Sequence, residues 1–366
     1  MKTLVISAVN IRKGGTLTIL RQCLEYLSSV AEQRQWRVVA IVHRKALCHY
    51  PAIDYIELPD VAKSWGRRLW CEYVTMHRIS KELGPIDLWL SLHDTTPRVQ
   101  AQRQAVYCQT SFPFLKWKLR DLRFDPKIVL FALLTRFAYR INIHRNSHLI
   151  VQAEWLRKGF SKMFRIPSDR FIVAPPQKPT LELQATEKGA QPFTFFFPST
   201  PDCHKNFELA CQAAKQLEQE VGAGRFQLII TIKGDENSYA RWLYKKWGSV
   251  DSIRFAGFLT KEQLFNTYAA SDCLLYPARV ETWGLAISEY SIYQKPMLLA
   301  DLPYAHETAA GHPYASFFDP EKIADLQAKM HALLDNDHSI LQPIPAVSPA
   351  QPIAEDWEKL FEILLQ

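Results

Sequence analysis

Glycine is scarce in this sequence, at 13 of 366 residues, and no internal repeat or low-complexity segment occurs. These absences exclude repeat and low-complexity architectures. What is present is typical of a globular protein, with 48% apolar and 22% charged residues. A chain of this length is long for a domain with a single hydrophobic core, so we expect about two domains.

Paired cysteines are missing as well. The seven cysteines are dispersed, and no Cys-x-x-Cys pair occurs. This pattern argues against a zinc site and against a disulfide framework, and it is typical of a protein in a reducing cytosol. The cysteines are Cys23, Cys48, Cys71, Cys108, Cys203, Cys211 and Cys273.

Long hydrophobic runs are also absent. No apolar run approaches the roughly 18 residues that a membrane-spanning helix requires. The stretch Met1–Asn10 is too short for the apolar part of a secretory signal, so we expect a first strand there. The sequence therefore predicts a cytoplasmic protein.

Positive charge is concentrated in one segment. The net charge is +7, and Phe112–Arg145 carries eight Lys or Arg against two Asp, nearly the whole excess. Its basic residues alternate with aromatic ones such as Phe114, Trp117 and Phe124. The alternation fits a surface on anionic lipid headgroups, and it fits equally well a solvated cationic face over a core helix. Nucleic acid is the weaker interpretation, because no recognised nucleic-acid-binding module accompanies the charge.

Short apolar runs alternate with helical patterns along the chain, in two series. A proline-rich linker, Pro175–Pro179, separates the series. Such alternation predicts two doubly wound α/β domains with a ligand cleft between them. We place the domains at 1–176 and 177–350, with a last amphipathic helix within 351–366.

Two features of the first domain are candidate ligand contacts. Gly14–Gly15 follow the first expected strand and precede a helix, where backbone amides can approach a phosphate. An ordinary tight turn explains the pair equally well. His93 follows the expected strand Ile86–Leu92, at the sheet edge where open α/β sheets bind ligands. A hydrogen-bonded loop histidine is the more common alternative.

The stretch Ser271–Pro303 predicts a strand, a loop, an apolar helix and a second strand. Glu281 lies in the loop, Gly284 ends it, and Glu289 is the one charged residue of the helix. A carboxylate on an apolar helix is costly to bury unless it is hydrogen-bonded, although it can also reach water at the rim of the helix. Two carboxylates flanking a helix N-terminus suggest a ligand with hydroxyls next to a phosphate.

Two lysines follow earlier strands of the same half. Lys205 precedes a helix, where a cation beside backbone amides suits a diphosphate, although a solvated lysine is the simpler explanation. Lys233 follows the next strand, within Lys233–Gly234–Asp235. Because carboxyl ends of parallel strands share one sheet edge, we expect Lys205, Lys233, Glu281 and Glu289 to line that edge.

At this point the sequence resembles the family 4 retaining glycosyltransferases of the GT-B fold. The resemblance covers nearly the whole chain and is strongest over about 195–310. There HKNFELA, KGD, IRFAGFLTKEQLFNTYAASDCLLYPARVETWGLAISEY and KPMLLADLPYAHE follow the family order. The Glu-x7-Glu signature is present as Glu281 and Glu289. The GT-B fold implies that the C-terminal helix packs back on the N-terminal domain.

The resemblance implies a role for each candidate. Glu281 would contact the sugar hydroxyls of the donor, Glu289 the ribose hydroxyls, and Lys205 the diphosphate. Backbone amides at Trp283, Gly284 and Leu285, and at Gly14–Gly15, would surround the phosphates or the donor–acceptor junction. His93 would stand beside the reaction centre.

The sequence departs from the family at one position. An arginine usually precedes the lysine, but Ser199–Thr200 occupy that region here. Arg12, Lys13 or Arg279 would then be the substitute cation. No metal motif occurs where the diphosphate is expected, and we interpret Asp335–Asn336–Asp337 as a surface turn. The resemblance therefore implies an enzyme without metal or other cofactor.

The expected function is transfer of a sugar from a nucleotide-diphosphate sugar, with retention, to a glycan or lipid-linked acceptor in surface-polysaccharide or lipopolysaccharide synthesis. The segment 112–145 would face the inner side of the cell membrane. Two alternatives stay open: a GT-B-fold nucleotide-sugar 2-epimerase, and a protein that binds a nucleotide sugar without transferring it.

Overall fold

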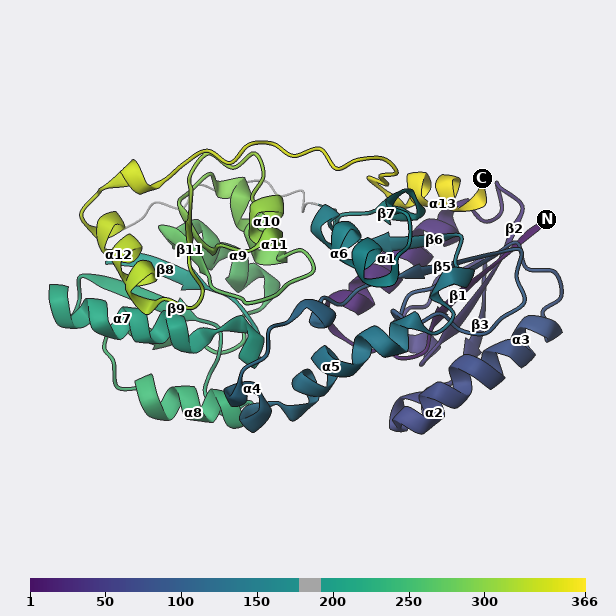
Figure 1. Ribbon diagram of the computed structural model, residues 1–366, viewed down its shortest axis with the longest axis horizontal. Helices are drawn as coiled ribbons and strands as arrows, with labels where there is room; N and C mark the ends of the chain where they lie inside the picture. Colours follow the sequence, from purple (N-terminus) through teal and green to yellow (C-terminus); the bar gives the residue numbers. More distant parts are fainter. Residues whose placement is uncertain (178–191) are drawn as a thin grey trace. The chain divides into compact units, whose positions relative to one another are not determined.

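The computed structural model describes residues 1–177 and 192–366 and has an α/β fold with two parallel sheets. The chain divides into two compact units (Figure 1). Unit 1 comprises Met1–Thr110, Leu134–Gln177 and Pro349–Gln366, and unit 2 comprises Ser111–Leu133 and Lys178–Ser348. The last residues of the expected linker, Lys178 and Pro179, lie outside the described residues.

The sheet of unit 1 has seven strands in the order β3-β2-β1-β4-β5-β6-β7. The order reverses between β1 and β4, so the loops after these two strands meet at the topological switch point, where open α/β sheets bind ligands. The strands are β1 (Lys2–Ala8), β2 (Trp36–Val42), β3 (Ile53–Glu57), β4 (Leu88–Ser91), β5 (Arg103–Tyr107), β6 (His148–Val151) and β7 (Phe171–Val173).

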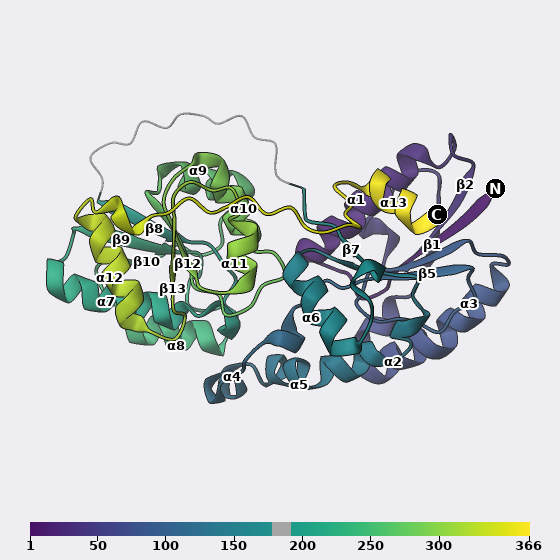
Figure 2. The ribbon, with the colours of Figure 1, turned by 45° about the horizontal axis from the view of Figure 1, so that its top comes forward.

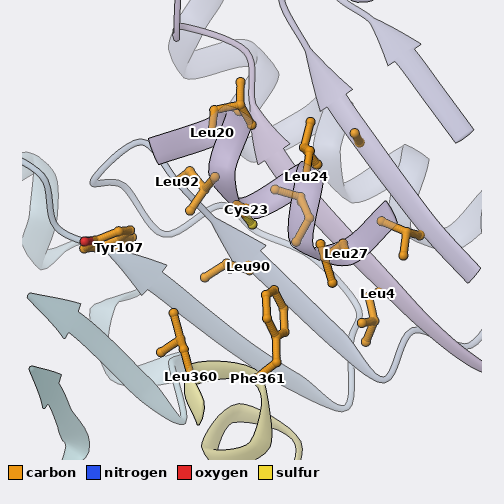
Figure 3. Close-up of a cluster of buried hydrophobic side chains, with 14 of the residues drawn as sticks. Leu4, Leu20, Cys23, Leu24, Leu27, Leu90, Leu92, Tyr107, Leu360 and Phe361 are labelled. Carbon is orange, nitrogen blue, oxygen red and sulfur yellow. The ribbon is translucent and has the colours of Figure 1, made fainter. Parts of the chain in front are cut away.

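Alternate residues of β1 point to opposite faces, and each face is covered by helices. Leu4 belongs to a core cluster with α1 (Gly14–Val30) and α13 (Trp357–Leu365), and the close-up in Figure 3 shows side chains of all three elements together. Val5 belongs to the cluster on the other face, with residues that include Met76 and Ile79 of α3 (Met76–Glu82). Burial on both faces explains why β1 and its neighbour β4 are nearly continuous apolar runs.

The remaining helices of unit 1 include one irregular stretch. The sequence predicts a single helix over 63–81, whereas the structure has α2 (Trp65–Trp70), one π-helical turn (Cys71–Thr75) and then α3. At the edge of the sheet formed by β6 and β7, α6 (Glu154–Phe164) packs near these two strands. In both ribbon views α13 lies beside α1 (Figure 2).

The sheet of unit 2 has six strands in the order β10-β9-β8-β11-β12-β13, with the switch point between β8 and β11. The strands are β8 (Phe193–Phe197), β9 (Phe226–Ile230), β10 (Ile253–Phe255), β11 (Cys273–Tyr276), β12 (Met297–Ala300) and β13 (Ala315–Phe318). The helices are α7 (Phe207–Val221), α8 (Ser238–Trp247), α9 (Lys261–Ala270), α10 (Leu285–Tyr290), α11 (Pro303–Thr308) and α12 (Ile323–Leu334). The predicted pair of doubly wound α/β sheets is confirmed.

The basic segment is divided between the two units. The sequence places all of it in the domain 1–176, but Ser111–Leu133 makes its contacts with unit 2. Asp121, on α4 (Leu119–Phe124), accepts a hydrogen bond of 2.6 Å from the Arg279 guanidinium, and both side chains are almost fully buried. The chain returns to unit 1 along α5 (Pro126–Arg140). Over the described residues, no helix is long and apolar enough to cross a membrane.

Candidate functional site

The loops after β8 and β11 bring the side chains of Lys205 and Glu281 together at the switch point of unit 2. After β8, a 3-10 turn (Cys203–Lys205) presents Lys205, and Asn206 in the left-handed region (φ 64°) turns the chain into α7. After β11, the loop presents Glu281. The Lys205 ammonium and the Glu281 carboxylate form an ion pair, with 13% and 14% of the side chains exposed.

A tyrosine holds each of the two candidate carboxylates. Tyr276, the last residue of β11, donates a hydrogen bond of 2.8 Å to Glu281 Oε1. Tyr268, on α9, donates one of 2.9 Å to Glu289 Oε2. Glu289 is half-buried, and desolvation raises its pKa although the Tyr268 hydroxyl opposes the rise. Both carboxylates therefore have fixed positions, and Glu289 does not simply extend into water from the helix rim.

Gly284 begins α10 with a backbone that favours glycine. Its φ is +94°, and an added Cβ would lie 3.3 Å from the Ile287 side chain. The neighbouring Leu285 is 45% exposed, and the Trp283 carbonyl accepts a hydrogen bond from the Thr308 hydroxyl. The turn holds Glu281 on one side and Glu289 on the other in a fixed local geometry.

Lys233 is an exposed residue of the loop after β9. Its side chain is 72% exposed, and its ammonium is 2.9 Å from Asp235 Oδ2, a contact that raises the pKa of Lys233. The carboxylate of Glu236 accepts hydrogen bonds from the amides of Lys233 and Gly234, at 2.6 and 2.9 Å. Lys233 follows β9, which is one strand away from the switch point, and its observed partner, Asp235, is an ordinary surface carboxylate.

The three proposed substitute cations have different surroundings. Arg279 is buried, with its guanidinium donating to Asp121 and to the carbonyls of Cys203 and Lys116. Arg279 therefore connects the loop of Glu281 to the turn of Lys205 and to α4. In this structure its guanidinium is occupied by these partners and is not available for a phosphate. Arg12 and Lys13 are exposed in unit 1.

In unit 1, Gly14–Gly15 form the exposed first turn of α1. Gly14 has φ +70°, and the residue before it, Lys13, makes no side-chain capping hydrogen bond. An exposed helix start without a side-chain cap leaves backbone amides for solvent or a ligand. Nothing lies within 4 Å of a Cβ built at either glycine, so only the backbone conformation of Gly14 calls for glycine here.

His93, after β4, is almost fully buried, with 4% of its surface exposed. Its Nδ1 lies 3.2 Å from Glu72 Oε1, on the π-helical turn. Arg68 donates a hydrogen bond of 3.0 Å to the His93 carbonyl and lies 3.9 Å from the Glu72 carboxylate. Burial lowers the pKa of His93 to about 3 and raises the pKa of Glu72 to about 7.

The sequence did not indicate Glu72 or Arg68 as site residues. Both lie within a stretch expected to be one regular helix, where acidic and basic residues are ordinary. The feature that singles out Glu72 is visible only in the structure. It lies on a π-helical turn, a departure from regular helix that is frequent at functional sites. In the part of the chain that the structure describes, no group of three His, Cys, Asp or Glu side chains is placed to hold a metal ion.

The unit that carries Lys205, Glu281 and Glu289 is similar to a known family. Residues 180–344 match the glycosyl transferases group 1 family. This glycosyl transferases group 1 domain contains all three side chains and both loops of the switch point. The comparison with curated proteins found no match.

The whole chain has the GT-B fold of solved glycosyltransferases. It is similar to the lipopolysaccharide outer core galactosyltransferase WaaB, with a TM-score of 0.63 and 12% identity over 93% of each chain. Sucrose-phosphate synthase from Thermosynechococcus elongatus has a TM-score of 0.61 and 13% identity, over 93% of this chain and 91% of that one. Anabaena HepE in complex with UDP-glucose has a TM-score of 0.61 and 12% identity, over 93% and 92%.

Proposed function

We propose that the protein is a retaining glycosyltransferase that moves a sugar from a nucleoside-diphosphate sugar to a glycan or lipid-linked acceptor. The observation that carries the proposal is the Lys205–Glu281 pair at the switch point of a glycosyl transferases group 1 domain, with Glu289 held nearby in sequence by Tyr268. A cation and two fixed carboxylates are the groups that a diphosphate and the hydroxyls of two sugars require.

The proposed step follows from the charges. The acceptor hydroxyl oxygen forms a bond to the anomeric carbon as the bond from that carbon to the diphosphate breaks. The bonding electrons leave with the diphosphate oxygen, which takes the acceptor proton. Lys205 stabilises the charge that grows on the diphosphate, and Glu281 binds donor hydroxyls while the carbon becomes oxocarbenium-like. No metal is needed in this scheme, so a chelator leaves the rate unchanged.

UDP-sugars are the first donors to test, because one similar structure, HepE, contains UDP-glucose. The similarity to WaaB, and to WaaG, described as a glycosyltransferase of lipopolysaccharide biosynthesis, supports a lipid-linked or surface glycan as acceptor. A cytoplasmic protein at the inner face of the membrane would meet both substrates.

The test is incubation of the full chain with radiolabelled UDP-glucose and other nucleotide sugars, with lipid-linked and soluble glycan acceptors. Labelled acceptor with the donor's anomeric configuration is the expected product. Conversion of the nucleotide sugar at C2 without an acceptor would favour the 2-epimerase instead. Binding of the nucleotide sugar without any turnover would favour a non-catalytic protein.

The decisive variants are Glu281→Ala and Lys205→Ala, each of which we expect to lower transfer by at least about a hundredfold, the range found for single charge-stabilising groups. Lys322→Ala is the matched control, because Lys322 is also paired with a carboxylate, Asp319, but is 71% exposed. Transfer that persists at the wild-type rate in both site variants contradicts the assigned roles.

A further inference from the structure

Three oxygen atoms converge on Nδ1 of His93. They are Oε1 of Glu72 and Oγ1 of Thr95, both at 3.2 Å, and Oγ of Ser91 at 3.4 Å. All four side chains are buried, with at most 8% of any one exposed. At these distances the oxygens either accept a proton from Nδ1 or donate one to it, and this choice decides which tautomer the imidazole adopts.

The protons of both hydroxyls are already used elsewhere. Thr95 Oγ1 donates to Glu72 Oε1 at 3.0 Å, and Ser91 Oγ donates to the Thr95 carbonyl at 2.8 Å. Each hydroxyl therefore turns a lone pair toward Nδ1. The Glu72 oxygen at 3.2 Å is also an acceptor, since it already receives the Thr95 proton. Three acceptors and no donor face Nδ1.

We infer that Glu72 is a positioning residue: with Thr95 and Ser91 it fixes His93 as the Nδ1–H tautomer, so that Nε2 offers a lone pair to a hydroxyl of a sugar ligand. The part that concerns the ligand rests on the proposed function. The part that concerns the tautomer rests only on the contacts around Nδ1.

The other ring nitrogen supports a ligand role. Nε2 of His93 is buried and has no hydrogen-bond partner among the described residues. A buried polar atom without a partner costs free energy that a donating ligand would recover. In this tautomer Nε2 accepts but does not donate, so it selects a hydroxyl over a phosphate oxygen. The ring is only 4% exposed, so the ligand part of the inference requires the residues that cover Nε2 to move.

The buried surroundings of the ring keep it neutral. Burial and the neighbouring Arg68 lower the pKa of His93 to about 3, so the imidazole carries a single proton at neutral pH. The Glu72 oxygens remain acceptors toward Thr95 whether or not the carboxyl is protonated on Oε2, which has no partner in the structure. With that proton on Oε2, Oε1 still accepts from Nδ1 and the tautomer is unchanged.

The test is the tautomer of His93 in the ligand-free full chain, read from the nitrogen NMR resonances of labelled histidine. Wild-type protein is expected to carry the proton on Nδ1. In Glu72→Met the Thr95 hydroxyl loses its acceptor at 3.0 Å and keeps only the His93 carbonyl at 3.5 Å, so we expect it to turn its proton to Nδ1 and the proton of His93 to move to Nε2. In the matched variant Thr95→Val, Glu72 still accepts from Nδ1, and the tautomer is expected to stay.

A wild-type protein with the proton on Nε2 overturns the inference outright, whether or not Glu72→Met folds. A proton that moves in Thr95→Val assigns the control of the tautomer to Thr95 and overturns the role of Glu72. Because no substrate is present, these results stand even if the protein transfers no sugar.

The ligand part has its own readout. With UDP-glucose as donor, we expect Glu72→Met to lower kcat/KM for transfer by about tenfold, whereas stabilisation of the same variant by UDP in a thermal-shift assay stays at the wild-type value. A moved proton with unchanged kinetic constants would show that no ligand hydroxyl uses Nε2, and it would overturn that part alone.

Discussion

Lys205 and Glu281 form an ion pair across 76 residues of sequence, and each side chain is mostly buried. In the free protein the carboxylate neutralises Lys205, the candidate diphosphate cation after β8. Tyr276 donates to the same carboxylate oxygen, so Glu281 is held when Lys205 leaves it. The pair is therefore suited to exchange, with Lys205 moving from the carboxylate to an incoming diphosphate.

This exchange predicts opposite effects on binding for the two partners. In Glu281→Gln, Lys205 no longer has to leave a charged partner, so we expect UDP to bind about threefold to tenfold more tightly, up to about 1.4 kcal/mol. In Lys205→Ala we expect about 10- to 100-fold weaker binding, the worth of about 1.5–3 kcal/mol for a charged hydrogen bond. Isothermal titration with UDP measures both changes. UDP binding that weakens in both variants would contradict the exchange.

Glu289 is predicted to recognise the ribose of the nucleotide. Wild-type protein should then bind UDP more tightly than 2′-deoxy-UDP, by about tenfold, because a hydrogen bond to a charged group is worth about 1.5–3 kcal/mol. In Glu289→Ala this preference should disappear, with UDP binding falling to the level of the deoxy compound. Competition binding of the two nucleotides measures the preference.

The control for this prediction is Tyr293→Phe. Tyr293 lies in the same aromatic cluster as Tyr268, but its hydroxyl donates to the Phe265 carbonyl and not to Glu289. The preference for UDP should survive in this variant. If Glu289→Ala still prefers UDP as strongly as the wild type does, the ribose contact lies elsewhere.

The burial of Glu72 predicts a pH dependence of stability. Its pKa is about 7 in the folded protein, above the ordinary value of 4.5, because burial outweighs the lowering effects of Arg68 and Thr95. The stability that Glu72 contributes is fully present below pH 4.5 and is lost as pH rises through 7. Relative to Glu72→Gln, the wild type should lose about 3 kcal/mol of unfolding free energy between pH 4.5 and 8. Urea denaturation of both proteins measures this difference.

The contribution of His93 to stability has the opposite sign, because burial lowers its pKa, so the comparison of wild type with Glu72→Gln reports on the contacting pair. A difference between wild type and Glu72→Gln that stays constant from pH 4.5 to 8 would mean that Glu72 does not titrate in this range.

What the sequence could predict depends on how far apart the interacting residues lie. The stretch from β11 to α10 is contiguous, and its strand, loop and helix are as expected from local pattern. The placement of His93 and Lys205 followed from one rule, that ligand loops come after parallel strands. The strand order that brings these loops to the two switch points needed the structure.

Long-range contacts explain what was missed. Asp121 and Arg279 are 158 residues apart, and nothing local in either segment indicates that they pair. Their contact explains why α4 belongs to unit 2, although its position in the sequence suggested the first domain. For Lys233 the structure shows an exposed pair with Asp235, and its place in a donor site stays a prediction. The roles of the individual site residues stay predictions until nucleotide binding is measured.

Part of the segment 112–145, which we predict to face a membrane, is occupied by contacts within unit 2. Side chains near its start are occupied within unit 2, where Lys118 pairs with Glu321 and Arg120 with Glu208. An exposed apolar stripe continues along α5 and the residue after it, with about half of each side chain exposed: Leu130, Leu133, Leu134, Phe137 and Ile141. From Pro126 to Ala153 the chain has four Lys or Arg and no acidic residue. An apolar stripe with basic neighbours fits an anionic lipid surface.

Replacing part of this stripe should therefore weaken membrane binding without affecting folding. We expect the full chain to sediment with vesicles of anionic phospholipid and much less with phosphatidylcholine alone, and Leu130→Ser/Phe137→Ser to lose most of that binding. Each replaced side chain is 54% exposed, so the thermal midpoint should change little. Val347→Ser, at a site 53% exposed, is the matched control and should bind as the wild type does. Wild-type protein that ignores anionic vesicles at low salt would rule out this surface, because screening is weakest there.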